Sequence, residues 1–230
     1  MIASWQAPLP NGKNSEELLV SFDAGRERRV LILPAMFDEA NKMRRLTVQV
    51  MRQLDLAEVD SFLPDMPGVN ESLAPLDRQT LMGWRSQVNA AAKSMNATHF
   101  LSIRAGALVA PDNLPGWHYA PQTGAKVLRA MIRARTIAAR EQGRKNGREE
   151  SSEQLLETGR REGLTLAGWT IGAEMFRELE TAEPIAAGGT ATIAQKDLNG
   201  AGLWLRAEPG EDDAQAAVLA AIVASQGLVS

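Results

Sequence analysis

Apolar runs and helix-spaced apolar positions alternate along the first half of this 230-residue chain. A short apolar run predicts a strand, and apolar side chains that then recur every three to four positions predict a helix on the same connection. This pair of signals occurs three times. The predicted strands are 30–33, 59–63 and 99–103, and the predicted helices are 43–54, 81–95 and one that starts at residue 104. Such alternation predicts an α/β fold with a mostly parallel sheet and helices on both faces.

The second half of the chain is less regular. Residues 115–121 predict another strand edge and a loop, and residues 126–140 predict a basic helix. Ser151-x-x-Gln154 has the form of a capping box, so a helix is expected from residue 152. Residues 190–194 and 202–206 read as the last two strands, and 218–223 as the buried side of a final helix. We expect a single domain over residues 1–230, with a small helical, cap-like insertion at about 123–182.

Composition adds several exclusions. The chain is 44% hydrophobic and 23% charged, with a net charge of -3, as in ordinary globular proteins. Residues 126–149 hold eight basic residues and two acidic ones. This basic stretch is not by itself enough to indicate a nucleic-acid partner, and none is expected. Within this stretch, 142–150 has almost no apolar anchor and is expected to be mobile. The absence of cysteine excludes disulfides and thiolate chemistry, and with no membrane span or signal-peptide pattern a cytoplasmic location is expected.

The predicted strand 99–103 turns into a predicted helix at Arg104, which is the layout of a nucleophile elbow. In α/β-hydrolases this turn reads G-x-S-x-G and presents a serine at the top of the sheet. Here it reads Ser102-Ile103-Arg104-Ala105-Gly106, with arginine in the nucleophile position. A guanidinium stays protonated and has no lone pair for attack, so a serine-hydrolase mechanism is excluded at Arg104.

The other members of a catalytic triad are also missing from their expected places. The histidine should follow the final strand, but the chain has only His99 and His118, which both lie earlier and are expected to be packed structural residues. Ser102, without an adjacent base, would be a weak nucleophile. The two histidines are far apart in the sequence and do not show the close spacing typical of metal ligands. Neither a metal nor a cofactor is therefore expected.

The loop after the first predicted strand supplies the candidate ligand-binding residues. On an α/β-hydrolase this loop lies beside the nucleophile, which brings it near Arg104. The candidate residues are Phe37, Asp38, Glu39, Asn41, Lys42, Arg104 and Ala105. A cation at a helix N-terminus needs an acidic partner, and Glu39 or Asp38 is expected to supply it. Two readings stay open: the pair fills a dead active site, or Arg104 binds a carboxylate or phosphate through its planar fork of donors.

A second candidate lies after the next predicted strand. Asp65 precedes the turn-forming Pro67 and Gly68, and the carboxyl ends of parallel strands are where such sheets bind ligands. We therefore expect Asp65 to line the same pocket as Glu39, Asn41 and Arg104. Asp65 and Glu39 are the candidates to activate a water molecule if the protein is catalytic.

Four segments carry a family signature. They are 34–45 (PAMFDEANKMRR), 102–108 (SIRAGAL), Trp117-x-x-x-Pro121-x-x-Gly124 and 166–169 (LAGW). Together they resemble an α/β-hydrolase-like family, the hydrolase 2 associated with the exosortase A system. The resemblance covers about residues 30–180 and implies a bacterial protein of exosortase and exopolysaccharide systems. The hydrolase label of that family follows from its fold and implies no particular reaction.

These observations favour an α/β-hydrolase-fold protein without the Ser-His-acid triad that binds an anionic or acylated small molecule. Two alternatives stay open. The protein is a hydrolase or acyltransferase of non-serine mechanism, with Arg104 stabilising an oxyanion, or it is a non-catalytic scaffold whose segment 151–179 docks a partner of the sorting or polysaccharide machinery.

Overall fold

The fold centres on a seven-stranded sheet. The computed structural model describes residues 1–141, 151–186 and 188–225, and for 139–141 it describes the backbone alone. The stretch 142–150, expected above to be mobile, lies outside the described residues. The sheet order is β1-β2-β4-β3-β5-β6-β9. The strands are β1 (Ile2–Pro8), β2 (Asn14–Phe22), β3 (Arg29–Leu33), β4 (Asp60–Pro64), β5 (His99–Ile103), β6 (Gly116–Tyr119) and β9 (Thr190–Ile193).

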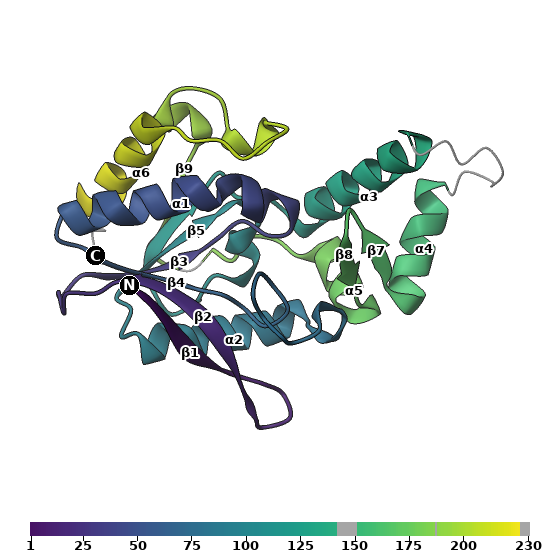
Figure 1. Cartoon of the computed structure of the whole chain (residues 1–230), viewed down its shortest axis with the longest axis horizontal. Coiled ribbons are helices and arrows are strands. Elements are labelled where there is room, and N and C mark those ends of the chain that lie inside the picture. The colour runs from purple at the N-terminus through teal and green to yellow at the C-terminus, as the bar shows by residue number, and fades with distance from the viewer. Residues whose placement is uncertain (142–150, 187, 226–230) are drawn as a thin grey trace.

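Most of the sheet is parallel, as the alternation of strands and helices predicts. The five strands from β4 to β9 run parallel, while β2 is antiparallel to both of its neighbours. Figure 1 shows α1 (Asp38–Leu56) and α6 (Asp213–Ser225) on one face and α2 (Leu81–Ser94) on the other. The α/β fold class, with helices on both faces, is confirmed.

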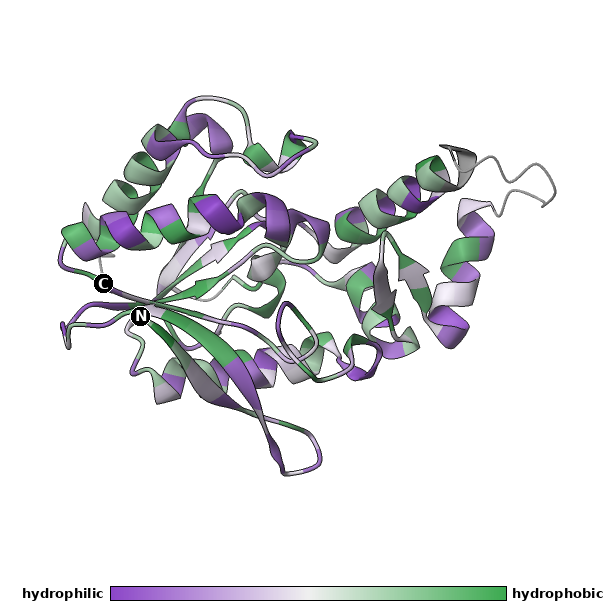
Figure 2. Ribbon diagram, in the orientation of Figure 1, coloured by the Kyte–Doolittle hydropathy of each residue, from purple (hydrophilic) through white to green (hydrophobic). Residues whose placement is uncertain are grey.

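Two apolar cores lie on the two faces of the sheet. Val30 and Ile32 point into the core shared with α1 and α6, whereas Leu31 and Leu33 point into the core shared with α2. Successive side chains of a strand face opposite sides, so a continuous apolar run fits a strand that is buried on both faces. Figure 2 shows polar and apolar positions alternating along α1 and α2, as expected for helices with one buried face.

The β1–β2 hairpin was not predicted from the sequence. In β1 only Trp5 and Ala7 are buried, so this outer strand carries little of the apolar signal that identifies the inner ones. The short strands β7 (Leu164–Leu166) and β8 (Trp169–Ile171) and the helix α5 (Ala173–Thr181) were missed as well. Three-residue strands are too short to show a period.

The predicted strand at 202–206 is wrong. Leu203–Leu205 form a turn of 3-10 helix instead. The Trp204 ring folds back over Gly202, where an added Cβ would lie 2.5 Å from a ring carbon. Because Gly202 has no Cβ, the Trp204 ring can pack directly against its backbone.

The helix predicted from residue 104 is only the 3-10 segment Arg104–Val109. Ala110 adopts an extended conformation with ψ of 145°, since the following Pro111 disfavours helical backbone at the preceding residue. The short helix ends there, and the chain returns to the sheet as β6.

The elements between β6 and β9 form a lobe beside the sheet. It contains α3 (Gly124–Glu141), α4 (Ser152–Glu162), the β7–β8 hairpin and α5, and Figure 1 shows it extending beyond one end of the sheet. The capping box at Ser151 is confirmed, because the Ser151 side chain accepts from the Gln154 amide and the Gln154 side chain accepts from the Ser151 amide. Reading 123–182 as a cap over a site stays an interpretation. Within the described residues no helix combines the length and the apolar character needed to cross a membrane.

Candidate functional site

Arg104 occupies the sharp turn that follows β5. Its φ is 56°, in the left-handed region that residues with a side chain rarely adopt. Two residues later, Gly106 passes so close to β3 that an added Cβ would lie 2.5 Å from the Leu33 carbonyl oxygen. The strained backbone at Arg104 and the close approach at Gly106 together give the geometry of a nucleophile elbow with an arginine at its tip.

The guanidinium of Arg104 is held by protein acceptors. Nε donates to Glu39 Oε2 at 2.9 Å and Nη2 to Glu39 Oε1 at 3.1 Å, which is the bidentate geometry of a strong ion pair. Nη1 donates to the Ala120 carbonyl at 2.9 Å and Nη2 also to Gln122 Oε1 at 3.1 Å. The expected pairing of Arg104 with an acidic residue of this loop is confirmed for Glu39. Asp38 pairs instead with Lys42, at 2.8 Å.

Trp204 covers the remaining face of the guanidinium. The Arg104 Cζ lies 4.0 Å from the centre of the Trp204 ring, a cation–π contact. The Trp204 ring also meets the Tyr119 ring in an edge-to-face arrangement, with 5.9 Å between the ring centres. The sequence pattern offered no signal for this contact, because it depends on the 3-10 turn that replaces the predicted strand.

A cleft of about 530 Å³ opens beside this ion pair. Its walls are the start of α1, Arg104, Gln122, one face of α3 and the segment around Trp204. The lining is mostly apolar and includes Met36, Val127 and Met131, with basic side chains at Lys42, Arg129 and Arg133. We call this space the Arg104 cleft.

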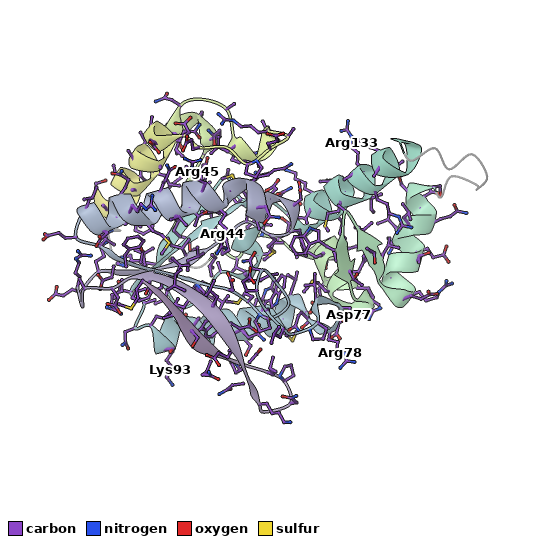
Figure 3. All side chains as sticks on the ribbon, viewed as in Figure 1. Arg44, Arg45, Asp77, Arg78, Lys93 and Arg133 are labelled. Carbon is purple, nitrogen blue, oxygen red and sulfur yellow. The ribbon has the colours of Figure 1, made fainter. Side chains whose placement is uncertain are left out.

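Of the candidate binding residues, Phe37, Asp38, Glu39, Lys42 and Arg104 line the Arg104 cleft, whereas the other candidates do not. Asn41 faces a separate hollow on the outer side of α1, beside Arg44 and Arg45, which Figure 3 labels. Ala105 is buried in the core that faces α2. Asp65 lines a different cavity, on the other side of the loop that precedes α1. The single pocket expected around Glu39, Asn41, Asp65 and Arg104 is therefore wrong, because helix phase turns Asn41 outward and the loop separates Asp65 from Arg104.

A serine–histidine pair lies within the sheet, and the sequence reasoning did not bring it together. Ser102 and His118 are opposite each other in the register of β5 and β6, with Ser102 Oγ 2.5 Å from His118 Nδ1. His118 Nε2 lies 2.7 Å from the Ile185 carbonyl oxygen, which can only accept, so Nε2 carries the proton and Nδ1 accepts from the serine. Burial lowers the pKa of His118 and keeps the ring neutral. The signal that could have found the pair is the adjacency of the two predicted strands.

This pair is a structural element of the sheet. Ser102 is fully buried and His118 is 3% exposed, so no substrate reaches the hydroxyl in this conformation. The second partner of the histidine is a backbone carbonyl, where a triad has a carboxylate. His99, the other histidine, stacks on Trp117 at 5.6 Å and is likewise a packed residue.

Activation of water by Glu39 also has little support in this geometry. Both carboxylate oxygens of Glu39 already accept hydrogen bonds from the Arg104 guanidinium. Over the described ranges, no group of three or more histidine and acidic side chains is gathered closely enough to hold a metal ion.

The geometry predicts that the protein does not react as a serine hydrolase. We expect neither fluorophosphonate labelling nor turnover of short p-nitrophenyl esters above a heat-denatured control, because Arg104 replaces the nucleophile and Ser102 is enclosed. Intact-mass measurement after labelling is the readout. Stoichiometric modification of Ser102, located by peptide mapping, would contradict this assignment.

The buried His118 predicts acid destabilisation. Its folded-state pKa is below the unfolded value of about 6.5, so the unfolded chain takes up the additional proton as the pH falls. Stability from the neutral imidazole is complete above that pH and decreases below it, with a limiting slope of about 1.4 kcal/mol per pH unit. Urea unfolding of wild type and His118→Gln between pH 7.5 and 5 measures the difference. Parallel stability curves for the two proteins would show that His118 does not titrate this way.

Comparison with solved structures identifies the fold. No known protein-family model matches the chain, and no curated protein matches it in sequence. A protein of Agrobacterium vitis S4 assigned as a hydrolase superposes with a TM-score of 0.50 and 11% identity, over 77% of this chain and 70% of that one. Est1E from Butyrivibrio proteoclasticus, solved with ferulic acid, superposes with a TM-score of 0.46 and 15% identity, over 73% of this chain and 68% of that one. An esterase from Pyrococcus furiosus superposes with a TM-score of 0.43 and 12% identity, over 60% of this chain and 56% of that one. With its mostly parallel sheet flanked by helices, the chain has the α/β-hydrolase fold.

Proposed function

We propose that this protein binds an anionic, acyl-type small molecule in the Arg104 cleft and performs no serine-nucleophile chemistry there. The observation that carries the proposal is the lining of the cleft, which combines a mostly apolar wall with basic side chains. A volume of about 530 Å³ lies within the range of small-molecule sites, which are mainly apolar with a few polar groups that fix orientation.

The arginines of α3 are the better anion partners. Arg129 and Arg133 are one helical turn apart on the exposed side of α3 that borders the cleft. Neither has an ion-pair partner among the residues that the structure describes, whereas Lys42 is paired with Asp38. Free guanidinium groups beside an apolar wall favour a carboxylate or phosphate head group.

Arg104 is best explained as a wall of the cleft. A guanidinium has five N–H donors, and at Arg104 four donor positions are directed to Glu39, Ala120 and Gln122. The planar fork that would bind an anion is thus occupied by Glu39. Of the two readings left open by the sequence, this geometry supports the pair that fills the former nucleophile position.

The apolar part of the ligand fits the remaining walls. Met36, Val127 and Met131 supply flexible or branched apolar side chains, and Trp204 supplies an aromatic face. An acyl chain placed there would remove apolar surface from water on both sides, at about 0.8 kcal/mol per CH2 group. The family resemblance of the sequence supports placing this binding activity in bacterial exosortase and exopolysaccharide systems.

The proposal predicts binding of straight-chain carboxylates. We expect octanoate to bind more tightly than butanoate, by up to roughly fourfold for each added CH2, because each group buries apolar surface in the cleft. The double variant Arg129→Gln with Arg133→Gln should weaken octanoate binding at least tenfold, since charge-assisted hydrogen bonds contribute about 1.5–3 kcal/mol. Isothermal titration calorimetry at pH 7.5 measures both effects.

The matched control removes two exposed positive charges elsewhere, with Arg78→Gln and Lys93→Gln. Figure 3 shows Arg78 and Lys93 on other parts of the molecule than Arg133. The control should bind octanoate like the wild type. If both double variants weaken octanoate binding equally, the effect comes from net charge and not from a site on α3. If the wild type does not bind octanoate, the scaffold alternative is favoured.

A second prediction separates the wall from the anion site. Arg104→Met alone should destabilise the protein by about 2 kcal/mol, because it leaves the mostly buried Glu39 carboxylate unpaired. Combining it with Glu39→Gln should restore stability to within about 1 kcal/mol of wild type, with octanoate affinity changed less than threefold. Chemical unfolding and calorimetry on both variants provide the test. Loss of octanoate binding in the stable double variant would show that Arg104 takes part in binding the carboxylate.

A further inference from the structure

A buried carboxylate lies apart from the Arg104 cleft. Asp65 follows β4 and is 3% exposed. Its Oδ1 accepts from Asn70 Nδ2 at 2.8 Å and lies 3.8 Å from Arg44 Nη1. Its Oδ2 is buried and has no hydrogen-bond partner in the part of the chain that the structure describes. Leaving a buried carboxylate oxygen without a donor is destabilising, so this atom indicates a missing partner.

Asp65 lines a cavity of about 50 Å³. The cavity lies between the loop that precedes α1, the loop that follows β4, and α2, with the half-buried Trp169 of β8 at its border. Three aromatic side chains line it: Phe37 packs against Trp84 at 6.3 Å and against Trp169 at 5.8 Å between ring centres. Asp65 and Asn70 are the polar side chains of this lining.

The size and lining restrict the occupant. At roughly 10–15 Å³ for each water-sized unit, the cavity holds about three to five non-hydrogen atoms. A water molecule normally needs two to four polar partners, and these walls are mainly apolar. An aliphatic amine fits both the carboxylate and the apolar walls of the cavity. Its ammonium group donates to a carboxylate and is attracted to aromatic rings, while its short chain contacts apolar walls.

We propose that this cavity is a second binding site, which takes the terminal ammonium of a small aliphatic amine against Asp65 Oδ2. Asp65 supplies the charge and the aromatic side chains supply the walls. The ligand classes of the two sites are opposite in charge, and the spaces share only Met36 and Phe37 in their linings. The amine site therefore stands independently of the function proposed for the Arg104 cleft.

The full-length chain is titrated with n-butylammonium chloride and, separately, with its neutral isostere 1-butanol at pH 7.5. Binding is followed through the indole Nε1–H NMR signals of the five tryptophans, with Trp169 assigned from Trp169→Phe. We expect saturable shifts at Trp84 and Trp169 with butylammonium, and affinity at least tenfold lower for 1-butanol.

Two variants and one control complete the experiment. Asp65→Asn keeps an acceptor for Asn70 and should weaken butylammonium binding at least tenfold. Ala40→Leu leaves Asp65 intact, fills the cavity from α1, and should have the same effect. Asp77→Asn removes an exposed carboxylate, labelled in Figure 3, and should bind like the wild type.

The outcomes decide between the occupants. Saturable butylammonium binding that is lost in Asp65→Asn and in Ala40→Leu supports the amine site. Absence of binding to the wild type means that the cavity holds water only and overturns the proposal. Equal affinity for 1-butanol and butylammonium, unchanged in Asp65→Asn, overturns the assigned charge. If Asp65→Asn does not fold, Ala40→Leu and the comparison with 1-butanol still decide.

Discussion

The ion pair of Arg104 with Glu39 organises one end of this molecule. The arginine side chain is 13% exposed and stands on a strained, left-handed backbone at the end of β5. A charge in that position is stable only if nearby groups replace the water it has lost. Three distant parts of the chain do so: the first turn of α1 through Glu39, the segment after β6 through Ala120 and Gln122, and the 3-10 turn through Trp204. At the position that holds the nucleophile in a hydrolase elbow, this protein has a side chain that connects three segments of the chain through its contacts.

The same pairing shapes the space available to ligands. Because Glu39 occupies the guanidinium fork, the basic side chains of the cleft lining that have no ion-pair partner among the described residues lie on α3, across the cleft. On the other side of Phe37 lies a smaller cavity, also mostly apolar, whose charged lining residue is the acidic Asp65. Phe37 has a φ of 54° and is fully packed between Trp84 and Trp169, so a strained residue forms the partition between the two spaces.

Ser102 and His118 illustrate why fold and reaction are separate questions. A serine within hydrogen-bonding distance of a neutral histidine is the core of a hydrolytic dyad, yet here both side chains are buried between strands. Through Ile185, the histidine connects the sheet to the segment that leads from the lobe into β9. An α/β-hydrolase fold positions such pairs easily, and their accessibility decides whether they have chemistry. The similarity to solved hydrolases accordingly identifies the architecture and leaves the reaction to the site itself.

The sequence by itself determined the features that depend on neighbouring residues. The continuous apolar run at 30–33 predicted one inner strand, because strands buried on both faces are rich in apolar residues, and the apolar-rich segments 59–63 and 99–103 predicted two more. The position of Arg104 after one of these strands excluded a serine nucleophile at residue 104, and the need to neutralise a buried cation predicted an acidic partner from the loop before α1. Weakly apolar edge strands and three-residue strands lacked that local signal.

Tertiary structure decided the contacts between residues far apart in the chain. Helix phase assigned Glu39 to Arg104 and Asp38 to Lys42, and turned Asn41 to the outside. Strand register placed Ser102 opposite His118, and the turn at Gly202 brought Trp204 onto Arg104 from 100 positions away. The loop before α1 separated Asp65 from the Arg104 cleft. Each of these depends on the relative placement of whole elements, which a pattern of neighbouring residues does not encode.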